Sequence, residues 1–188
     1  MDPVSHPTEV LGQIGYLSED RDLPDWMNVQ DLIRFTAAFY PNWDDRYARE
    51  LQTFELQPKQ KIKSLSRGQR ARVGLLLALA HRPELLILDE PSSGLDPVVR
   101  RDILGAIIRT VADEGRTVLF SSHLLDEVQR VSDRVAMLHR GELVLSETLD
   151  DVLNSHFCLT ARFPIPLNHP PQIKGALRCE GSDREWTI

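Results

Sequence analysis

The stretch Leu85-Leu86-Ile87-Leu88-Asp89-Glu90-Pro91 decides the fold of this chain. Four apolar residues closed by carboxylates are typical of a strand that is buried on both faces of a parallel sheet. Open α/β sheets bind their ligands outside the carboxyl ends of such strands. Asp89 is therefore placed to hold a divalent cation, and Glu90 to orient or deprotonate an attacking water. The alternative is a pair of solvated acids, which the adjoining Pro91 disfavours.

Helices and strands alternate on both sides of this stretch. Before it, residues 66–82 have the pattern of a helix that Ser66 caps and Pro83 ends. After it come a helix over 98–112 and a second continuous apolar strand over 117–121. Alternation of this kind implies right-handed crossovers and a mainly parallel sheet. The remaining expected elements are a strand at 14–17, a helix at 124–131, and a hairpin with strands at 135–139 and 143–145.

Two regions depart from this alternation. Residues 20–64 have helical spacing at 29–40 and 44–56 and no strand pattern, so we expect a small helical subdomain there. After residue 155 the composition changes, because prolines interrupt short strand-like runs. We expect two strands at 176–179 and 185–188, joined by a turn at 180–183, as the start of a small β domain.

Composition narrows the classes of function. The chain has 188 residues and a net charge of −6, with no basic tail, so we expect no nucleic-acid partner. No run of eighteen apolar residues predicts a membrane span, and the first residues lack the pattern of a signal peptide. Cys158 and Cys179 lie far apart, and we expect them to be reduced thiols in the cytosol.

A second motif, Leu65-Ser66-Arg67-Gly68-Gln69, stands where a helix begins. Free backbone N–H groups and the positive end of the helix dipole suit such a position to an anion. Gly68 allows a phosphate to approach the backbone, and the Ser66 hydroxyl adds a donor. The same residues are equally consistent with an ordinary helix cap flanked by surface polar residues.

Two further elements complete the constellation. Asp96 lies in the turn Ser92-Ser93-Gly94-Leu95-Asp96 and is suited to cap the next helix. His123 follows the strand at 117–121 in Ser121-Ser122-His123, where an imidazole is able to bond a phosphate or a water. A purely structural role for this histidine stays open.

Taken in this order, the motifs resemble those of the ATP-binding-cassette (ABC) ATPase family over about residues 3–155. The segment 65–69 resembles the signature motif LSGGQ, with Arg67 replacing the first glycine. The resemblance implies that Asp89 and Glu90 are the Walker B aspartate and the catalytic glutamate. It also implies that residues 93–96 form the D-loop and that His123 is the switch histidine. The expected fold is then the α/β, mainly parallel sheet of an ABC-type P-loop ATPase with a helical subdomain.

The segment Ile14-Gly15-Tyr16-Leu17-Ser18-Glu19 resembles the Q-loop of the same family, with Glu19 where glutamine is usual. The resemblance implies that Glu19, together with Asp89, binds Mg²⁺, in this case with a full charge. Three features are similar to those of bacterial exporters whose ATPase and membrane parts are separate chains. They are the glutamate in this position, Asp25-Trp26-Met27 and residues 39–44.

One family motif is absent. A P-loop reads G-x-x-x-x-G-K-[ST], and none of the ten glycines is followed by lysine. The family places that loop well before the Q-loop segment. We therefore expect residues 1–155 to be an ABC ATPase domain that is incomplete at its N-terminus, and residues 156–188 to be the beginning of a truncated β extension.

The resemblance implies an ATP-hydrolysing subunit that uses ATP and Mg²⁺. The expected partners are a second ABC ATPase subunit and separate transmembrane permease subunits, which hold the chain at the cytoplasmic face of the cell membrane. Each ATP would lie between two subunits, with the signature residues Ser66, Arg67, Gly68 and Gln69 of one chain near the nucleotide of the other, and Asp96 is also expected to bind nucleotide. An alternative is a non-catalytic or degenerate module that only donates its signature motif. A soluble ABC protein of translation or DNA repair is a third.

Overall fold

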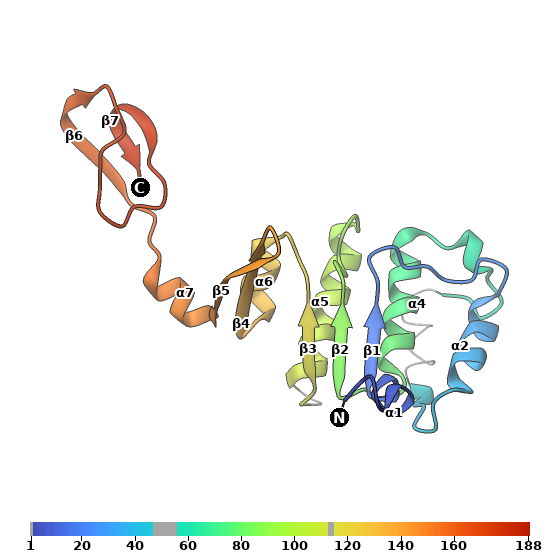
Figure 1. The fold of residues 1–188 in the computed structure, drawn as a ribbon. Coiled ribbons are helices and arrows are strands. Elements are labelled where there is room, and N and C mark those ends of the chain that lie inside the picture. The colour runs from blue at the N-terminus through green and yellow to red at the C-terminus, as the bar shows by residue number, and fades with distance from the viewer. Residues whose placement is uncertain (1, 47–55, 113–114) are drawn as a thin grey trace. The chain divides into compact units, whose positions relative to one another are not determined.

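The computed structural model describes residues 2–46, 56–112 and 115–188, which fall into two compact units (Figure 1). The first unit is Met1–Val131 and the second is Ser132–Ile188. The described elements of the first unit are α1 (Pro7–Gly12), β1 (Ile14–Leu17), α2 (Val29–Ala37), the short 3-10 helix η1 (Ile62–Ser64), α4 (Arg67–Leu79), β2 (Leu85–Leu88), α5 (Pro97–Ala112), β3 (Thr117–Phe120) and α6 (Leu125–Val131).

The described strands of the first unit form a parallel sheet in the order β1-β2-β3 (Figure 1). Ile14 pairs with Leu85, which pairs in turn with Thr117, and both registers continue without a shift. Helices α4 and α5 connect these strands, so the predicted α/β fold with a parallel sheet is confirmed. All three strands end at the same edge of the sheet.

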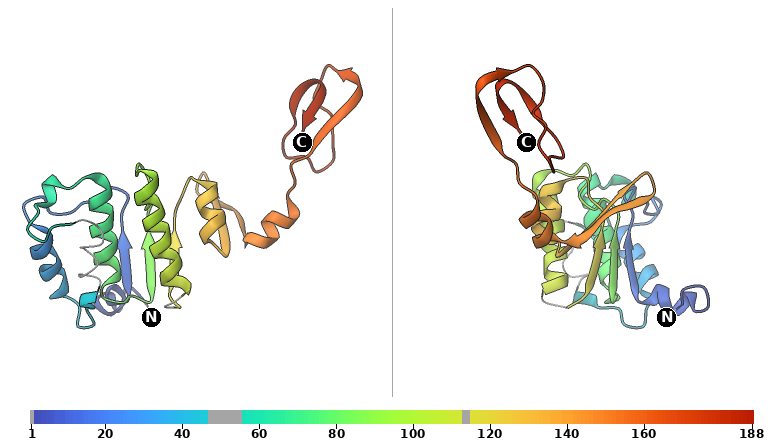
Figure 2. Two further views of the ribbon diagram at one scale, coloured as in Figure 1. Left: turned by 180° about the vertical axis from the view of Figure 1, so that it is seen from behind. Right: turned by 60° about the vertical axis from the view of Figure 1, so that its left-hand side comes forward.

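One face of the sheet packs against α4 and α5, and Figure 2 shows this layer from two further sides. Leu86 and Leu88 are buried on that face, whereas Tyr16 and Leu119 on the opposite face are 59% and 61% exposed. The prediction of burial on both faces is therefore wrong for β3, and it holds only in part for β2, whose Leu85 and Ile87 are half-buried. Gly15 allows β1 to approach α4, since a Cβ there would lie 2.2 Å from the Ala78 carbonyl oxygen.

The expected helical subdomain is present in part. Asn28 caps α2, because its side chain accepts a hydrogen bond from the Asp31 backbone N–H at 2.8 Å. Helix α2 ends at Ala37, before the predicted residue 40. Apolar residues of α2 and η1 pack against one face of α4 in a second core cluster. The predicted helix at 44–56 lies largely outside the described residues.

Helix boundaries differ from the sequence-based predictions by a few residues. Ser66 caps α4 as predicted, but α4 ends at Leu79 and a turn leads to Pro83. Helix α5 begins at Pro97, the helical position where a missing N–H costs nothing. The short helix α1 was not predicted.

The second unit contains β4 (Arg134–His139), β5 (Glu142–Thr148), α7 (Leu149–Ser155), β6 (Thr160–Leu167) and β7 (Glu180–Thr187). The predicted β4–β5 hairpin is confirmed, with strands longer than expected. The predicted strand pair after residue 175 is wrong: residues 180–183 belong to β7, whose partner is β6. The prolines in β6 were taken as strand breakers, but a two-stranded ribbon leaves an open edge where proline is tolerated. Across the described ranges, no helix is long and apolar enough to cross a membrane.

Candidate functional site

The candidate site lies at the carboxyl ends of β1, β2 and β3. Strand β2 delivers Asp89 and Glu90 to this edge. The backbone N–H of Asp89 donates to the Leu17 carbonyl at 2.8 Å, which extends the β1–β2 pairing by one residue. On the other side, the Ser121 N–H donates to the Leu88 carbonyl at 2.9 Å. Backbone pairing with both neighbouring strands therefore fixes the position from which the Asp89 and Glu90 side chains extend.

The Ser121 hydroxyl bridges the two acidic residues. It donates to Asp89 Oδ1 at 2.7 Å and accepts from the Glu90 backbone N–H at 2.8 Å. The sequence placed Ser121 only as a neighbour of His123. No pattern in a single sequence indicates that its hydroxyl would reach across from β3 to β2.

Glu90 and His123 are brought together. His123 Nδ1 lies 2.8 Å from Glu90 Oε2, within hydrogen-bond distance, and the two residues come from the ends of adjacent strands. The glutamate side chain is 19% exposed and the histidine side chain 65% exposed. A carboxylate held by an imidazole at a solvent-accessible edge is suited to take a proton from a water.

Glu19 stands at the end of β1, beside the same edge. Its Oε1 accepts a hydrogen bond from the Ser93 hydroxyl at 3.4 Å. Among the described residues, no group of three or more His, Cys, Asp or Glu is arranged to hold a metal ion. Mg²⁺ in phosphate-binding sites needs only one or two carboxylates, because phosphate and water oxygens complete its shell. Asp89 and Glu19 carry oxygen donors of the kind that such an ion takes, and their role as its ligands stays a prediction.

The segment Ser66–Gln69 forms the N-terminus of α4. Ser66 Oγ accepts from the Gln69 N–H at 3.2 Å, while Gln69 Oε1 accepts from the Ser66 N–H at 3.0 Å, which is a complete capping box. The helix-cap interpretation of these residues is thus correct. It leaves the Ser66 hydroxyl proton and the Gln69 amide hydrogens available as donors.

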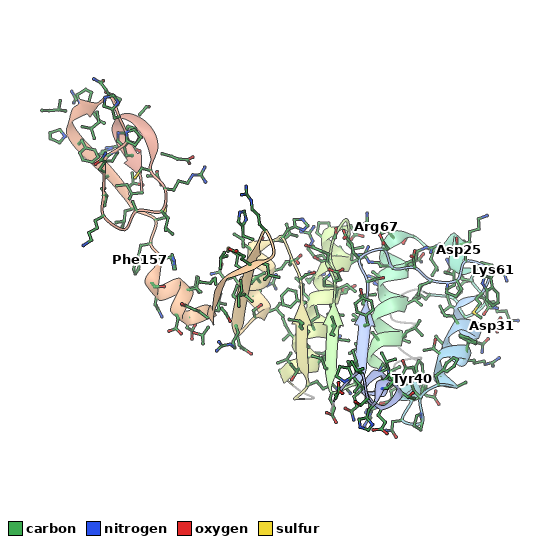
Figure 3. The ribbon with its side chains drawn as sticks, viewed as in Figure 1. Asp25, Asp31, Tyr40, Lys61, Arg67 and Phe157 are labelled. Carbon is green, nitrogen blue, oxygen red and sulfur yellow. The ribbon has the colours of Figure 1, made fainter. Side chains whose placement is uncertain are left out.

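Gly68 and Arg67 have packing partners that the sequence did not indicate. A Cβ on Gly68 would lie 2.9 Å from the nearest Val99 methyl carbon, so this glycine allows α4 to approach α5. The Arg67 guanidinium lies against Gly94, which has φ +64°. Figure 3 labels Arg67 at the start of α4. No hydrogen bond or ion pair between described residues joins the 66–69 segment to Glu90 or His123.

Asp96 caps α5. Its Oδ1 accepts from the backbone N–H groups of Val98 and Val99 at 3.0 and 3.1 Å. The structural role anticipated for this aspartate is thus present, and its proposed contact with nucleotide stays a prediction.

Two buried charged residues near the site were missed by the sequence analysis. Glu127 on α6 is 2% exposed and accepts hydrogen bonds from the hydroxyls of Ser92 and Ser122. Arg21 is 3% exposed and donates to backbone carbonyls of the loop after β2. Burial lowers the pKa of the Arg21 guanidinium, and the positive charge of Arg67 acts in the same direction. Arg21 stands in a charged stretch with acidic neighbours, so nothing in the sequence indicated its burial.

The fold and the strand-edge carboxylates are similar to those of one class of proteins, the ATP-binding cassettes. The family model described as ABC transporter matches residues 3–93. A solved structure titled as the ATP-binding subunit of an ABC transporter superposes with a TM-score of 0.74 at 27% identity, covering 82% of this chain and 67% of that one. The dimeric post-hydrolysis structure of the cassette MJ0796 with ADP and Pi has the same fold, with a TM-score of 0.68 at 23% identity over 79% of this chain and 68% of that one.

The curated relatives agree with this class. The ABC transporter ATP-binding protein YtrB of Bacillus subtilis is 30% identical over 164 residues, which are 87% of this chain and 56% of the relative. An ABC transporter ATP-binding protein of Methanocaldococcus jannaschii, MJ1023, is 35% identical over 77% of this chain and 57% of its own length. The chain thus spans about half the length of the curated relatives it matches. Over the part that they share, the chain is similar to the ATP-binding proteins of ABC transporters.

Proposed function

We propose that this chain carries the hydrolytic residues of an ABC transporter ATPase subunit, and that ATP hydrolysis there powers an exporter. The observation that carries the proposal is the contact between Glu90 and His123 at the carboxyl edge of a parallel sheet. The proposal of an exporter rests on Glu19 and on the tryptophan-containing segments near residues 26 and 43, which are similar to those of exporter ATPases.

In this proposal Glu90 accepts a proton from the water that attacks the γ-phosphate. With both ring nitrogens protonated, the His123 imidazolium donates through Nδ1 to the Glu90 carboxylate and through Nε2 to a phosphate oxygen. Asp89 and Glu19 would hold Mg²⁺, which neutralises charge on the phosphate oxygens when it is bound. Ser121 keeps the Asp89 carboxylate oriented toward this position.

The phosphate-gripping loop is proposed to lie outside these 188 residues, because no glycine among them is followed by lysine. The partners follow from the relatives. The MJ0796 cassette is described as a dimer, so we propose that this chain also pairs with a second ATPase subunit. Permease subunits would hold the pair at the cytoplasmic face of the membrane.

A second candidate function has one observation in its favour, the same lack of a P-loop motif in the sequence. In that case the chain only donates the Ser66–Gln69 helix terminus to the nucleotide of a partner chain. Glu90 would then have no role in turnover.

Glu90→Gln separates the two candidates. The substitution is nearly isosteric but leaves no carboxylate to accept a proton, so turnover by the assembled ATPase should fall about 100-fold or more at saturating ATP. Binding of ATP should persist. Glu84→Gln is the matched control, because Glu84 is exposed just before the opposite end of β2. An unchanged rate in Glu90→Gln, with loss of activity in Ser66→Asp, would favour the donor module.

A further inference from the structure

Arg21 occupies an unusual position for a charged residue. It lies two residues after Glu19, in the turn that follows β1, and only 3% of it is exposed. Its backbone N–H donates to the Ser18 carbonyl at 3.2 Å, and its φ of +52° turns the chain inward. The side chain is thereby directed at the loop that follows β2.

The side-chain hydrogen bonds of Arg21 all go to backbone carbonyls of that loop. Burial lowers the pKa of the guanidinium, and the negative charge of Glu19 raises it in part. Nη2 donates to the carbonyl oxygens of Pro91 and Ser93, each at 3.0 Å, and lies 3.5 Å from the Glu90 carbonyl oxygen. A single guanidinium nitrogen thus lies within hydrogen-bond distance of three backbone carbonyl oxygens from a stretch of four residues. Any change in the course of the loop would break these bonds together.

This arrangement is costly as a source of stability. The Nε and Nη1 groups of Arg21 are buried and have no hydrogen-bond partner among the described residues. A buried cation whose charge is not balanced by a bonded carboxylate loses more by desolvation than it gains. The position of the arginine is therefore better explained by what it holds.

The held segment is conformationally strained. Glu90 has φ +43°, a left-handed conformation that costs a non-glycine residue about 1–3 kcal/mol and persists only where its surroundings enforce it. Ser121 binds the Glu90 N–H from the β3 side, and Arg21 lies against the Glu90 C=O from the β1 side. The backbone N–H and C=O of Glu90, the proposed general base, are therefore both held by side chains, one from the end of β3 and one from the loop after β1.

We propose that Arg21 is a positioning residue, which fixes the strained backbone of Glu90 so that its carboxylate meets His123. It also joins the loop that carries Glu19 to the loop that carries Glu90, so that a displacement of one is transmitted to the other. The inference rests on the proposed function for its catalytic consequence, but the positioning itself is measurable without nucleotide.

The first experiment is hydrogen exchange by NMR on this chain with Arg21→Met. The amides to follow are those of Glu90, Ser93 and Leu95. Their N–H groups donate hydrogen bonds to Ser121 Oγ and to the carbonyls of Glu90 and Ser92, in the loop after β2 that Arg21 contacts or beside it. Their protection should fall about tenfold or more relative to β2, because the loop opens locally once the grip is lost. Arg72→Met is the control, since Arg72 donates to Asp102 at 2.6 Å and binds a different element.

Arg21→Lys keeps the charge and one donor group, so it should restore part of the protection. If Arg21→Met fails to fold, the comparison of Arg21→Lys with the wild type decides: protection lost only at the three loop amides supports the proposal. Protection lost evenly over the first unit in a variant that still folds, or protection unchanged in the loop, overturns it.

The second experiment measures ATP turnover by the assembled ATPase. Arg21→Met should lower kcat about tenfold or more while KM for ATP changes little, and Arg21→Lys should recover part of kcat. Arg72→Met should leave both unchanged. If the loop amides lose protection but Glu90→Gln leaves turnover intact, the positioning role stands and the proposed function fails. If the amides lose protection and kcat is unchanged although Glu90→Gln abolishes turnover, the catalytic consequence of the proposal is overturned.

Discussion

Replacing Glu127 with leucine tests whether a buried carboxylate ties the loops after β2 and β3 together. Both Glu127 oxygens lie 2.7 Å from Ser92 Oγ, and the Ser122 hydroxyl donates to Oε2 at 3.0 Å. Arg100 Nε lies 3.5 Å from Oε1 without hydrogen-bond geometry, and its side chain is 36% exposed, so its contribution is screened and small. The two serine hydroxyls therefore determine the effect.

Leucine relieves the desolvation cost of the carboxylate but leaves the Ser92 hydroxyl, which is fully buried, without an acceptor. An unpaired buried hydroxyl costs about 1–3 kcal/mol, and this is the expected loss of unfolding free energy. Adding Ser92→Ala removes that hydroxyl, so the double variant should recover about half of the loss or more.

Urea unfolding followed by circular dichroism at the helical band measures these differences, with m values compared to confirm that the transitions are alike. Asp126→Asn is the control, because Asp126 is the exposed neighbour of Glu127 on the same helix. Strictly additive effects of Glu127→Leu and Ser92→Ala would refute the reasoning, since they would show that the two side chains do not depend on each other.

Two further predictions concern the packing around α4. Gly68→Ala places a Cβ 2.9 Å from a Val99 methyl carbon. This overpacking should cost about 1–3 kcal/mol of unfolding free energy, offset in part by the better helix propensity of alanine. Val99→Ala should suppress the loss in a double-mutant cycle, and additive effects would contradict the prediction. Burial lowers the pKa of His81, whose Nε2 bonds the Ile14 carbonyl, so the unfolded chain takes up the proton first. The free energy of unfolding should then fall as the pH drops below about 6.5, the ordinary histidine pKa. His81→Gln should flatten the dependence of stability on pH between about pH 7.5 and 5.5. The same dependence in the variant and the wild type would contradict this.

Local sequence was sufficient for the sheet and for most of the site. The apolar run before Asp89 defines β2, and the parallel pairing of β1, β2 and β3 follows from alternation with helices. Because parallel strands end at one edge, Glu90 and His123 were expected at the same edge of the sheet, but their direct contact was not predicted.

The supporting contacts could not be anticipated, because they depend on tertiary distances. Arg21 and Glu127 are ordinary polar residues of a turn and a helix until packing buries them. Gly68 was interpreted as an opening for phosphate, but the proximity of Val99 gives it a packing reason as well. The strand β6 was missed because the tolerance for Pro164 and Pro166 depends on its having an open edge.

We propose that ATP is hydrolysed between two subunits, with Glu90 of one and the Ser66 helix terminus of the other. Ser66→Asp tests the second half cleanly, because aspartate is as good a helix cap as serine but repels an anion at the helix N-terminus. Gly68 is a poorer target, since it packs against Val99.

The decisive measurement is the ATPase rate of an equal mixture of Ser66→Asp and Glu90→Gln subunits in the assembled complex. Each variant alone should be inactive. In mixed pairs, the Ser66→Asp subunit keeps its own Glu90 and receives an intact helix terminus from its partner. Half of the pairs then contain one complete site, so the mixture should regain up to about a quarter of the wild-type rate if the sites act independently. No activity in isolated mixed pairs, or full activity of Ser66→Asp alone, would contradict the account.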